Sequence, residues 1–198
     1  MQQQLQTILQ AVLSLEGLAV ALAIVYLLLA ARESLWCWLC AFVSSAIYVW
    51  LCWESKLYME TWLNVFYAVM AVLGWWQWRQ GSGGSDSRTI TTLTTMQHLL
   101  FAAIVSVLSL GNGYYLQHNT DAAWPYVDSF ITWSSVVVTF LVVRKVLENW
   151  LYWILIDGIA IVVYFDRERY LTALLFAGYV VIVVFGYFKW RREYQQAT

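Results

Sequence analysis

Asp157 lies in the middle of ENWLYWILIDGIAIVVYFD, residues 148–166, a segment that is otherwise apolar and long enough to cross a membrane. Trp150 and Trp153 precede it by seven and four residues, so an α-helix would place all three side chains on one face. A carboxylate at the centre of a bilayer costs about 2.5–3.5 kcal/mol, and such residues face a bundle interior or a wet cavity. Because indole faces attract cations and a carboxylate neutralises them, this face is suited to an organic cation.

Two more acids, Glu16 and Asp128, lie toward the ends of other apolar segments. Polar and aromatic residues recur at helical spacing in these segments, in the sets Asp128, Thr132 and Ser135; Ser45, Tyr48 and Cys52; and Asn64, Tyr67 and Ala71. Every Lys and Arg lies at the end of an apolar segment or in a loop, which leaves the acids without a predicted counter-charge inside the membrane. A cationic ligand would supply that charge.

Structural roles are the alternative for each of these residues. Asp157 could be protonated and hydrogen-bonded between helices, and Glu16 and Asp128 could be purely structural. Trp150 fits either a cavity or an interface position. We expect the tryptophans near segment ends to lie in the aromatic belts of the membrane interface: Trp36, Trp53, Trp76, Trp78 and Trp190.

The elements that must position these residues are transmembrane helices. The 198-residue chain is 62% hydrophobic and 12% charged, with thirteen Trp and a single Pro, which is typical of a membrane protein. The N-terminal apolar run is too long for a signal peptide and MQQQLQT before it has no Lys or Arg, so we expect a retained first span. Seven spans are predicted, at about 9–30, 35–53, 57–78, 93–110, 124–143, 149–165 and 170–190.

Basic residues predict the orientation of these spans. The side on which the chain starts carries three, Lys56, Arg167 and Arg169, and the other side carries eight: Arg32, Arg79, Arg88, Arg144, Lys145, Lys189, Arg191 and Arg192. The positive-inside rule therefore places the N-terminus outside and the C-terminus in the cytoplasm.

An internal repeat organises the seven spans. GWWQWR (74–79) and GYFKWR (186–191) lie 112 positions apart, and the same shift aligns Glu16 with Asp128 and Ser45 with Asp157. The shift covers four spans, an even number, so the copies have the same orientation. We predict a single all-α membrane domain over 1–198 with a 3+1+3 parallel repeat: repeat 1 at about 9–79, a cytoplasmic connection QGSGGSDSR at 80–88, a linker helix at about 93–110, and repeat 2 at about 123–191. Parallel repeats are a transporter architecture, with the substrate site near the midplane between the halves.

Other classes of protein lack their motifs. The sequence has no H-E-x-x-H or G-x-S-x-G, and His98 and His118 are about 30 Å apart on one helix, too far to share a haem. Lys189 is at the cytoplasmic edge of the last span, not inside it as a retinal protein requires. Cys37, Cys40 and Cys52 are interpreted as packing residues. We expect no enzymatic activity, no catalytic or metal site, no cofactor and no nucleic-acid partner.

ENWLYWILID followed by RYLTALLF, WPYVDS, and KLYMETWLNVFYAVMAVLGWWQW resemble segments of the PnuC vitamin transporters, and the similarity covers nearly the whole chain. The resemblance implies a SWEET-like bundle of seven helices and a homotrimer in the bacterial inner membrane. It also implies facilitated diffusion of an unphosphorylated vitamin, which phosphorylation then traps inside.

The resemblance extends to site residues. Glu16 and Asp128 match acids of the nicotinamide-riboside members, and Trp150 and Trp153 match the W-x-x-W-x-x-x-[N/D] signature. Asp157 stands where those members usually have Asn, and Ala71 stands where they tend to have another amide. These differences resemble the thiamine-transporting branch, PnuT, since thiamine has a cationic thiazolium and an aminopyrimidine that carboxylates can bind.

We therefore expect a uniporter for thiamine, a small cationic vitamin, embedded in membrane lipid, with nicotinamide riboside as the alternative substrate. The expected substrate-binding residues are Glu16, Tyr48, Asn64, Tyr67, Asp128, Thr132, Trp150, Trp153 and Asp157. In this hypothesis the acids bind or neutralise the substrate, the indoles stack on it, and the remaining residues complete the cage.

Overall fold

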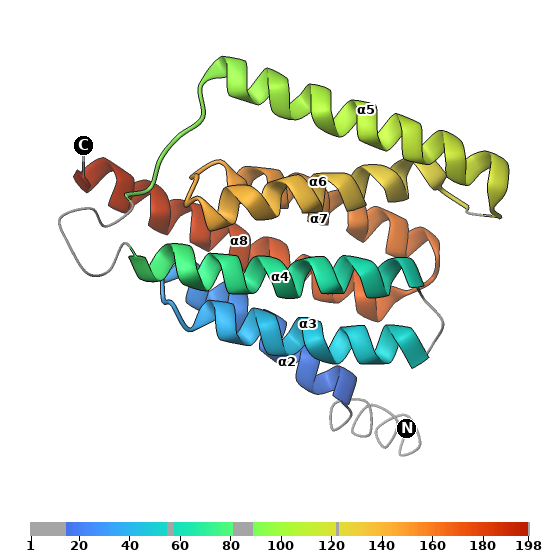
Figure 1. The fold of residues 1–198 in the computed structure, drawn as a ribbon, viewed down its shortest axis with the longest axis horizontal. Coiled ribbons are helices and arrows are strands. Elements are labelled where there is room, and N and C mark those ends of the chain that lie inside the picture. Colours follow the sequence, from blue (N-terminus) through green and yellow to red (C-terminus); the bar gives the residue numbers. More distant parts are fainter. Residues whose placement is uncertain (1–14, 55–57, 81–88, 122, 198) are drawn as a thin grey trace. The chain divides into compact units, whose positions relative to one another are not determined.

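The structure is a computed structural model that describes residues 15–54, 58–80, 89–121 and 123–197. The chain forms two compact units, residues 1–87 and residues 88–198. The described residues form seven helices (Figure 1): α2 (Leu15–Ala31), α3 (Cys37–Glu54) and α4 (Tyr58–Gln80) in the first unit, and α5 (Thr95–Asn119), α6 (Pro125–Val143), α7 (Asn149–Asp166) and α8 (Tyr170–Ala197) in the second.

All seven expected spans correspond to helices, so the all-helical prediction is confirmed. Five helices, α3, α5, α6, α7 and α8, are long and apolar enough to cross a membrane. α2 is apolar but has only 17 described residues, and α4 is not among the five because polar residues interrupt its apolar run. The start of the first expected span (9–14), residue 57 and most of the segment 80–88 lie outside the described residues.

The helix boundaries follow from local sequence. α6 begins at Pro125, whose fixed φ suits the first helical position. α5 begins with a capping box, in which the Thr94 side chain accepts from the Gln97 N–H and the Gln97 side chain accepts from the Thr94 N–H. α5 ends at Asn119 rather than at 110, so the linker helix is longer than predicted.

Three of the tight connections between helices share one backbone conformation. Glu33, Lys145 and Glu168 follow α2, α6 and α7 with φ of 52°, 54° and 57°. The next residue donates its backbone N–H back to a carbonyl five residues earlier, at 2.9–3.0 Å, in the pairs Ser34–Leu29, Val146–Leu141 and Arg169–Tyr164. This left-handed helix end satisfies carbonyls that would otherwise lack a partner, and it makes consecutive helices antiparallel.

In the first unit α3 packs against both α2 and α4. The buried Ser44 hydroxyl donates to the Ala19 carbonyl at 2.8 Å, which joins α3 to α2 inside the membrane span. Trp38 of α3 is 2% exposed. Its ring lies where a Cβ on Gly74 would be, 2.4 Å from the nearest ring atom, so glycine permits the close approach of α3 and α4.

In the second unit α7 packs against α6 and α8, and α5 packs against α6. Small and polar residues form the α5–α6 contact, as expected for helices that meet in a membrane. The Asn112 side chain donates to the Ser129 hydroxyl at 2.9 Å, and a Cβ on Gly113 would lie 2.4 Å from the Tyr126 ring. α5 is therefore attached to the second unit through α6.

The segment before α5 is attached to the loop between α6 and α7. The Leu147 N–H donates to the Thr91 carbonyl at 2.8 Å, and the Thr91 N–H donates to the Lys145 carbonyl at 3.1 Å, forming an isolated parallel bridge. The Leu93 N–H donates to both oxygens of Glu148 at 3.2 Å. These bonds attach the segment that precedes α5 to the loop between α6 and α7.

Each unit contains the same tryptophan motif, at the predicted spacing of 112 residues. Trp38 and Trp78 meet edge to face with ring centroids 5.2 Å apart and an angle of 86°, and Trp150 and Trp190 meet at 5.3 Å and 86°. A Cβ on Gly186 would lie 2.7 Å from the Trp150 ring, as one on Gly74 would clash with Trp38. The two units therefore use the same internal contact to hold their second and third repeat helices together.

The interface-belt interpretation of Trp78 and Trp190 was wrong. Trp78 is 5% exposed and Trp190 is 0% exposed, because each packs on the tryptophan at the start of the neighbouring helix. Trp36, Trp53 and Trp76 are each about 60% exposed, as belt residues would be. Proximity to the end of a segment did not distinguish the buried tryptophans from the exposed ones. The tryptophan that buries Trp78 or Trp190 lies on a neighbouring helix, which the position along one segment does not reveal.

Candidate functional site

Asp157 lies in the middle of α7 and is 4% exposed. Within the part of the chain that the structure describes, no hydrogen bond or ion pair reaches its carboxylate. Burying an acid without a partner is unfavourable, so the position needs a proton, water or a ligand to be stable. Ser45, which occupies the matching position in the first unit, is also buried, at 7% exposed, but it is neutral.

The two signature tryptophans have different surroundings. Trp150, in the first turn of α7, is 2% exposed and packs on Trp190 and on the Gly186 backbone of α8. Its indole nitrogen is buried without a partner among the described residues. Trp153, one turn further along, is half-buried and has no aromatic partner within that same part of the structure. The geometry therefore assigns Trp150 to the core of the second unit and leaves the Trp153 ring available.

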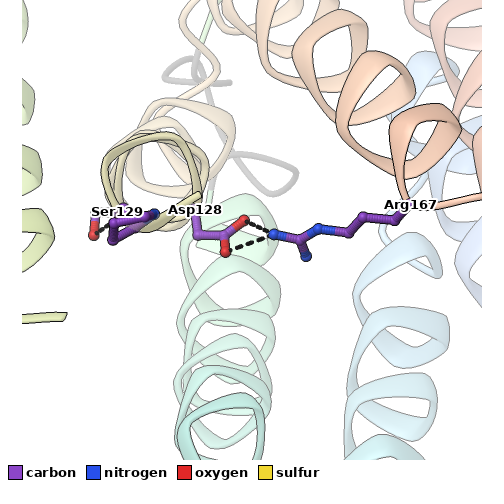
Figure 2. A network of polar contacts seen from close by, with 4 residues as sticks. Asp128, Ser129 and Arg167 are labelled. Atoms are coloured by element: carbon purple, nitrogen blue, oxygen red, sulfur yellow. Dashed lines mark hydrogen bonds and ion pairs between the residues drawn. The ribbon is translucent and has the colours of Figure 1, made fainter. Parts of the chain in front are cut away.

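Asp128 has a counter-charge, contrary to the expectation that the acids lack one. Figure 2 shows Arg167 reaching Asp128, with Nη2 2.9 Å from Oδ2 and 3.2 Å from Oδ1. Asp128 lies in the first turn of α6 and Arg167 caps the C-terminal end of α7, and the side chains of Asp128 and Arg167 are 35% and 33% exposed. A loop arginine reaches the acid because α6 and α7 are consecutive antiparallel helices.

The sequence contained the signal for this pair. Asp128 opens the fifth span and Arg167 follows the sixth, so the predicted topology placed both at the same membrane surface. Considering only charges at mid-membrane depth overlooked a long side chain that extends from the loop.

The residues next to Asp128 on α6 face in different directions. Ser129 is 1% exposed, accepts from Asn112 and donates to the Pro125 carbonyl, so it faces α5. Thr132, one turn after Asp128, is half-buried, and Ser135 is 6% exposed. α6 thus presents Asp128 toward α7 while its serine side binds the linker helix.

The remaining predicted site residues belong to the first unit. Glu16 lies in the first turn of α2 and is exposed, and Tyr48 of the neighbouring α3 is half-buried. Asn64 of α4 is half-buried and donates its amide to the Glu60 carbonyl of its own helix at 2.8 Å, which leaves its side-chain oxygen for another donor. Tyr67 is half-buried one turn later.

Other groups that could bind a cofactor are separated from one another. No group of three or more His, Cys, Asp and Glu side chains with metal-binding geometry occurs among the residues described. His98 Nδ1 lies 2.6 Å from the Tyr152 hydroxyl, and His118 Nδ1 lies 2.8 Å from the Tyr114 carbonyl. Cys37, Cys40 and Cys52 lie on one helix, and none of them forms a disulfide among the described residues.

An all-helical chain with several apolar helices of spanning length belongs to the class of multi-pass membrane proteins. Residues 13–192 match the family described as the nicotinamide mononucleotide transporter. The chain therefore belongs to this family of transporters, in agreement with the resemblance to PnuC transporters, and it is not an enzyme.

A solved structure supports the fold. The chain is similar to the vitamin B3 transporter PnuC, whose crystal structure it matches with a TM-score of 0.71 and 22% sequence identity, over 93% of this chain and 83% of that chain. At this identity the similarity concerns the fold. No curated protein sequence matches the chain.

Proposed function

We propose that this transporter takes up an unphosphorylated cationic vitamin, with thiamine as the substrate. The observation that carries the proposal is the carboxylate of Asp157, which is buried in the middle of α7 without a partner in the described residues. A cationic substrate would compensate its charge, and the aminopyrimidine of thiamine would donate hydrogen bonds to it.

Each predicted site residue of the second unit then has a proposed role. Asp157 binds the aminopyrimidine, the half-buried Trp153 stacks on a substrate ring, and Asp128 and Thr132 contact the substrate at the end of α6. Trp150 holds α7 against α8 and so positions Asp157 and Trp153 indirectly. In the first unit, Glu16, Tyr48, Asn64 and Tyr67 remain the proposed contact residues.

The charges also favour a substrate without phosphate. A phosphate group carries about −1.5 to −2 charges at pH 7. Next to the proposed acids Glu16, Asp128 and Asp157 it would be repelled, and the buried position of Asp157 would strengthen that repulsion. Uptake of the free vitamin by facilitated diffusion, followed by phosphorylation in the cell, therefore fits the site better than uptake of a nucleotide.

Nicotinamide riboside is the alternative substrate, and the comparisons favour it. The family is described as the nicotinamide mononucleotide transporter, and the solved structure with the similar fold is that of a vitamin B3 transporter. Nicotinamide riboside is also a cation. However, its carboxamide oxygen needs a hydrogen-bond donor, which neither an ionised carboxylate at Asp157 nor the 2% exposed methyl group of Ala71 supplies.

We further propose the arrangement that the resemblance implies. The seven helices form a SWEET-like 3+1+3 bundle, three chains assemble as a homotrimer in the bacterial inner membrane, and the N-terminus faces outward. The tryptophan motif that recurs after 112 residues supports the parallel repeat, and the distribution of Lys and Arg supports the orientation.

Calorimetric titration of purified protein in detergent tests the substrate. We expect thiamine to bind more tightly than nicotinamide riboside, riboflavin or thiamine pyrophosphate. Asp157→Asn should weaken thiamine binding at least tenfold, since it removes a charge-assisted hydrogen bond worth about 1.5–3 kcal/mol. The difference in affinity between thiamine and nicotinamide riboside should therefore become smaller.

Asp166→Asn is the matched control, because it removes the same charge from the exposed end of the same helix. Tighter binding of nicotinamide riboside by the wild-type protein would keep the transporter class and replace the substrate. An unchanged thiamine affinity in Asp157→Asn would refute the role of Asp157.

A further inference from the structure

The ion pair between Asp128 and Arg167 occupies one of the acids that the proposed function assigns to the substrate. Both carboxylate oxygens accept from the same nitrogen, Nη2, at 2.9 and 3.2 Å. The other guanidinium nitrogens form no bond within the described residues. The strongest pairs between arginine and a carboxylate use two nitrogens in a fork. This pair lacks that fork and is therefore weaker than a bidentate pair.

The surroundings of the pair allow the two charges to separate. Both side chains are about one third exposed, so water can solvate each of them when the bond breaks. Asp128 lies in the first turn of α6, where the helix dipole favours an anion, and Arg167 lies at the C-terminal cap of α7, where it favours a cation. Each charge is thus stabilised in its own place, and the contact contributes little to holding the helices together.

The backbone around Arg167 is hydrogen-bonded in a helix-ending turn, whereas its side chain has Asp128 as its polar partner among the described residues. The Arg167 N–H donates to the Val163 carbonyl, and the Arg169 N–H donates to the Tyr164 carbonyl, which closes the left-handed turn at Glu168. Rotation of the Arg167 side chain can therefore separate the guanidinium from Asp128 without any change in the backbone.

The arginine is a feature of one repeat only. The shift of 112 residues that aligns Asp128 with Glu16 places Ser55 opposite Arg167. In the first repeat this position is a serine, and the basic residue of the loop is Lys56, one position later. The two repeats therefore differ in the type and position of the basic residue, and the inference concerns the second repeat alone.

We propose that Arg167 is an internal counter-ion that occupies Asp128 when no substrate is present and that the cationic substrate displaces it on binding. This inference rests on the proposed function, because it takes Asp128 as a substrate contact. Arg167 then lowers the affinity for cations and prevents Asp128 from holding the substrate too tightly to release it. A neutral molecule cannot replace Arg167 as the counter-ion of Asp128. Arg167 therefore lowers the affinity for cationic ligands and leaves the affinity for neutral ligands unchanged.

The test compares a charged ligand with an uncharged one of the same shape. Thiamine and its neutral thiophene isostere, deazathiamine, are titrated into wild-type protein and Arg167→Gln. Arg167→Gln should bind thiamine about two- to five-fold more tightly, which is the range that the loss of a competing exposed ion pair allows. Its affinity for deazathiamine should not change. In an Asp128→Asn background Arg167→Gln should have no effect.

Two control variants separate this effect from simpler ones. Arg169→Gln removes the same charge from the same loop without contacting Asp128, and it should leave the thiamine affinity unchanged. Arg167→Lys keeps a cation within reach of Asp128 and should behave like the wild type. An equal gain in Arg169→Gln would overturn the proposal in favour of a general charge effect. Weaker binding of both ligands in Arg167→Gln, together with a lower Tm, would overturn it in favour of a structural role.

The ligand preference of the wild-type protein tests the proposed function separately from the role of Arg167. If the wild-type protein prefers nicotinamide riboside, thiamine is refuted as the substrate. The role of Arg167 is then measured with nicotinamide riboside and its uncharged reduced form in the same variants, with the same expected direction. If neither cation binds, both proposals fail.

Discussion

Trp150 and Trp153 are three residues apart on α7, yet they have different physical roles. Trp150 is 2% exposed and fills a space against Gly186 and Trp190, whereas Trp153 is half-buried without a ring partner in the described residues. A signature that contains both therefore combines one residue that builds the unit with one that is available for a ligand.

Alanine substitutions should separate the two roles. Trp150→Ala removes a fully packed side chain and should lower the free energy of unfolding by about 3–5 kcal/mol. Trp153→Ala should change stability much less and weaken thiamine binding roughly 5- to 30-fold, which corresponds to the loss of a desolvated cation–π contact of about 1–2 kcal/mol. Thermal unfolding in detergent and calorimetric titration measure the two effects. A stable Trp150→Ala protein with weakened binding would instead place Trp150 in the site.

Helices in each unit approach closely where glycine faces tryptophan. Gly74 of α4 lies against Trp38, and Gly186 of α8 lies against Trp150. Helix association in a membrane depends on such packing, since lipid removes the hydrophobic driving force between apolar surfaces. The repeated glycine–tryptophan contact therefore allows the close helix packing that stabilises each unit.

Gly186→Ala should destabilise the protein. Its Cβ would lie 2.7 Å from the Trp150 ring, so the helices must shift, at a cost of about 1–3 kcal/mol. Gly178→Ala on the same helix is the matched control, because nothing lies within 4 Å of its Cβ and alanine favours helix by up to about 1 kcal/mol. We expect a lower Tm for Gly186→Ala and an equal or higher Tm for Gly178→Ala. Equal values for both variants would show that the close contact is unimportant.

The distribution of basic residues along the sequence predicts the orientation of the protein in the membrane. Eight of eleven basic residues lie on the side that we assign to the cytoplasm, and the Asp128–Arg167 pair lies on the other side. A vitamin taken up from outside would therefore meet this pair on entry, in agreement with its proposed role.

Labelling of single cysteines in intact cells tests this orientation. In a variant whose three native cysteines are replaced, Asp121→Cys in the connection between α5 and α6 should react with a membrane-impermeant maleimide. Gln196→Cys, in the last turns of α8, should react only after the membrane is opened. The reverse pattern would invert the topology and place the Asp128–Arg167 pair at the cytoplasmic surface.

The sequence alone determined the number, order and approximate bounds of the helices, because continuous apolar runs of spanning length have few alternative structures in a membrane. It also predicted the spacing of the tryptophan motif, since Trp38, Gly74 and Trp78 recur as Trp150, Gly186 and Trp190. The buried position of Asp157 followed from its place in the middle of a span.

Only the tertiary structure decided which partner each side chain has. It paired Arg167 with Asp128 across 39 residues, moved Trp78 and Trp190 from the membrane interface to the core, and separated Trp150 from Trp153. Periodicity gives the face of a helix but not the neighbour that this face meets. That neighbour depends on the helix ends at Glu33, Lys145 and Glu168 and on glycine contacts between helices, which bring together residues that are distant in sequence.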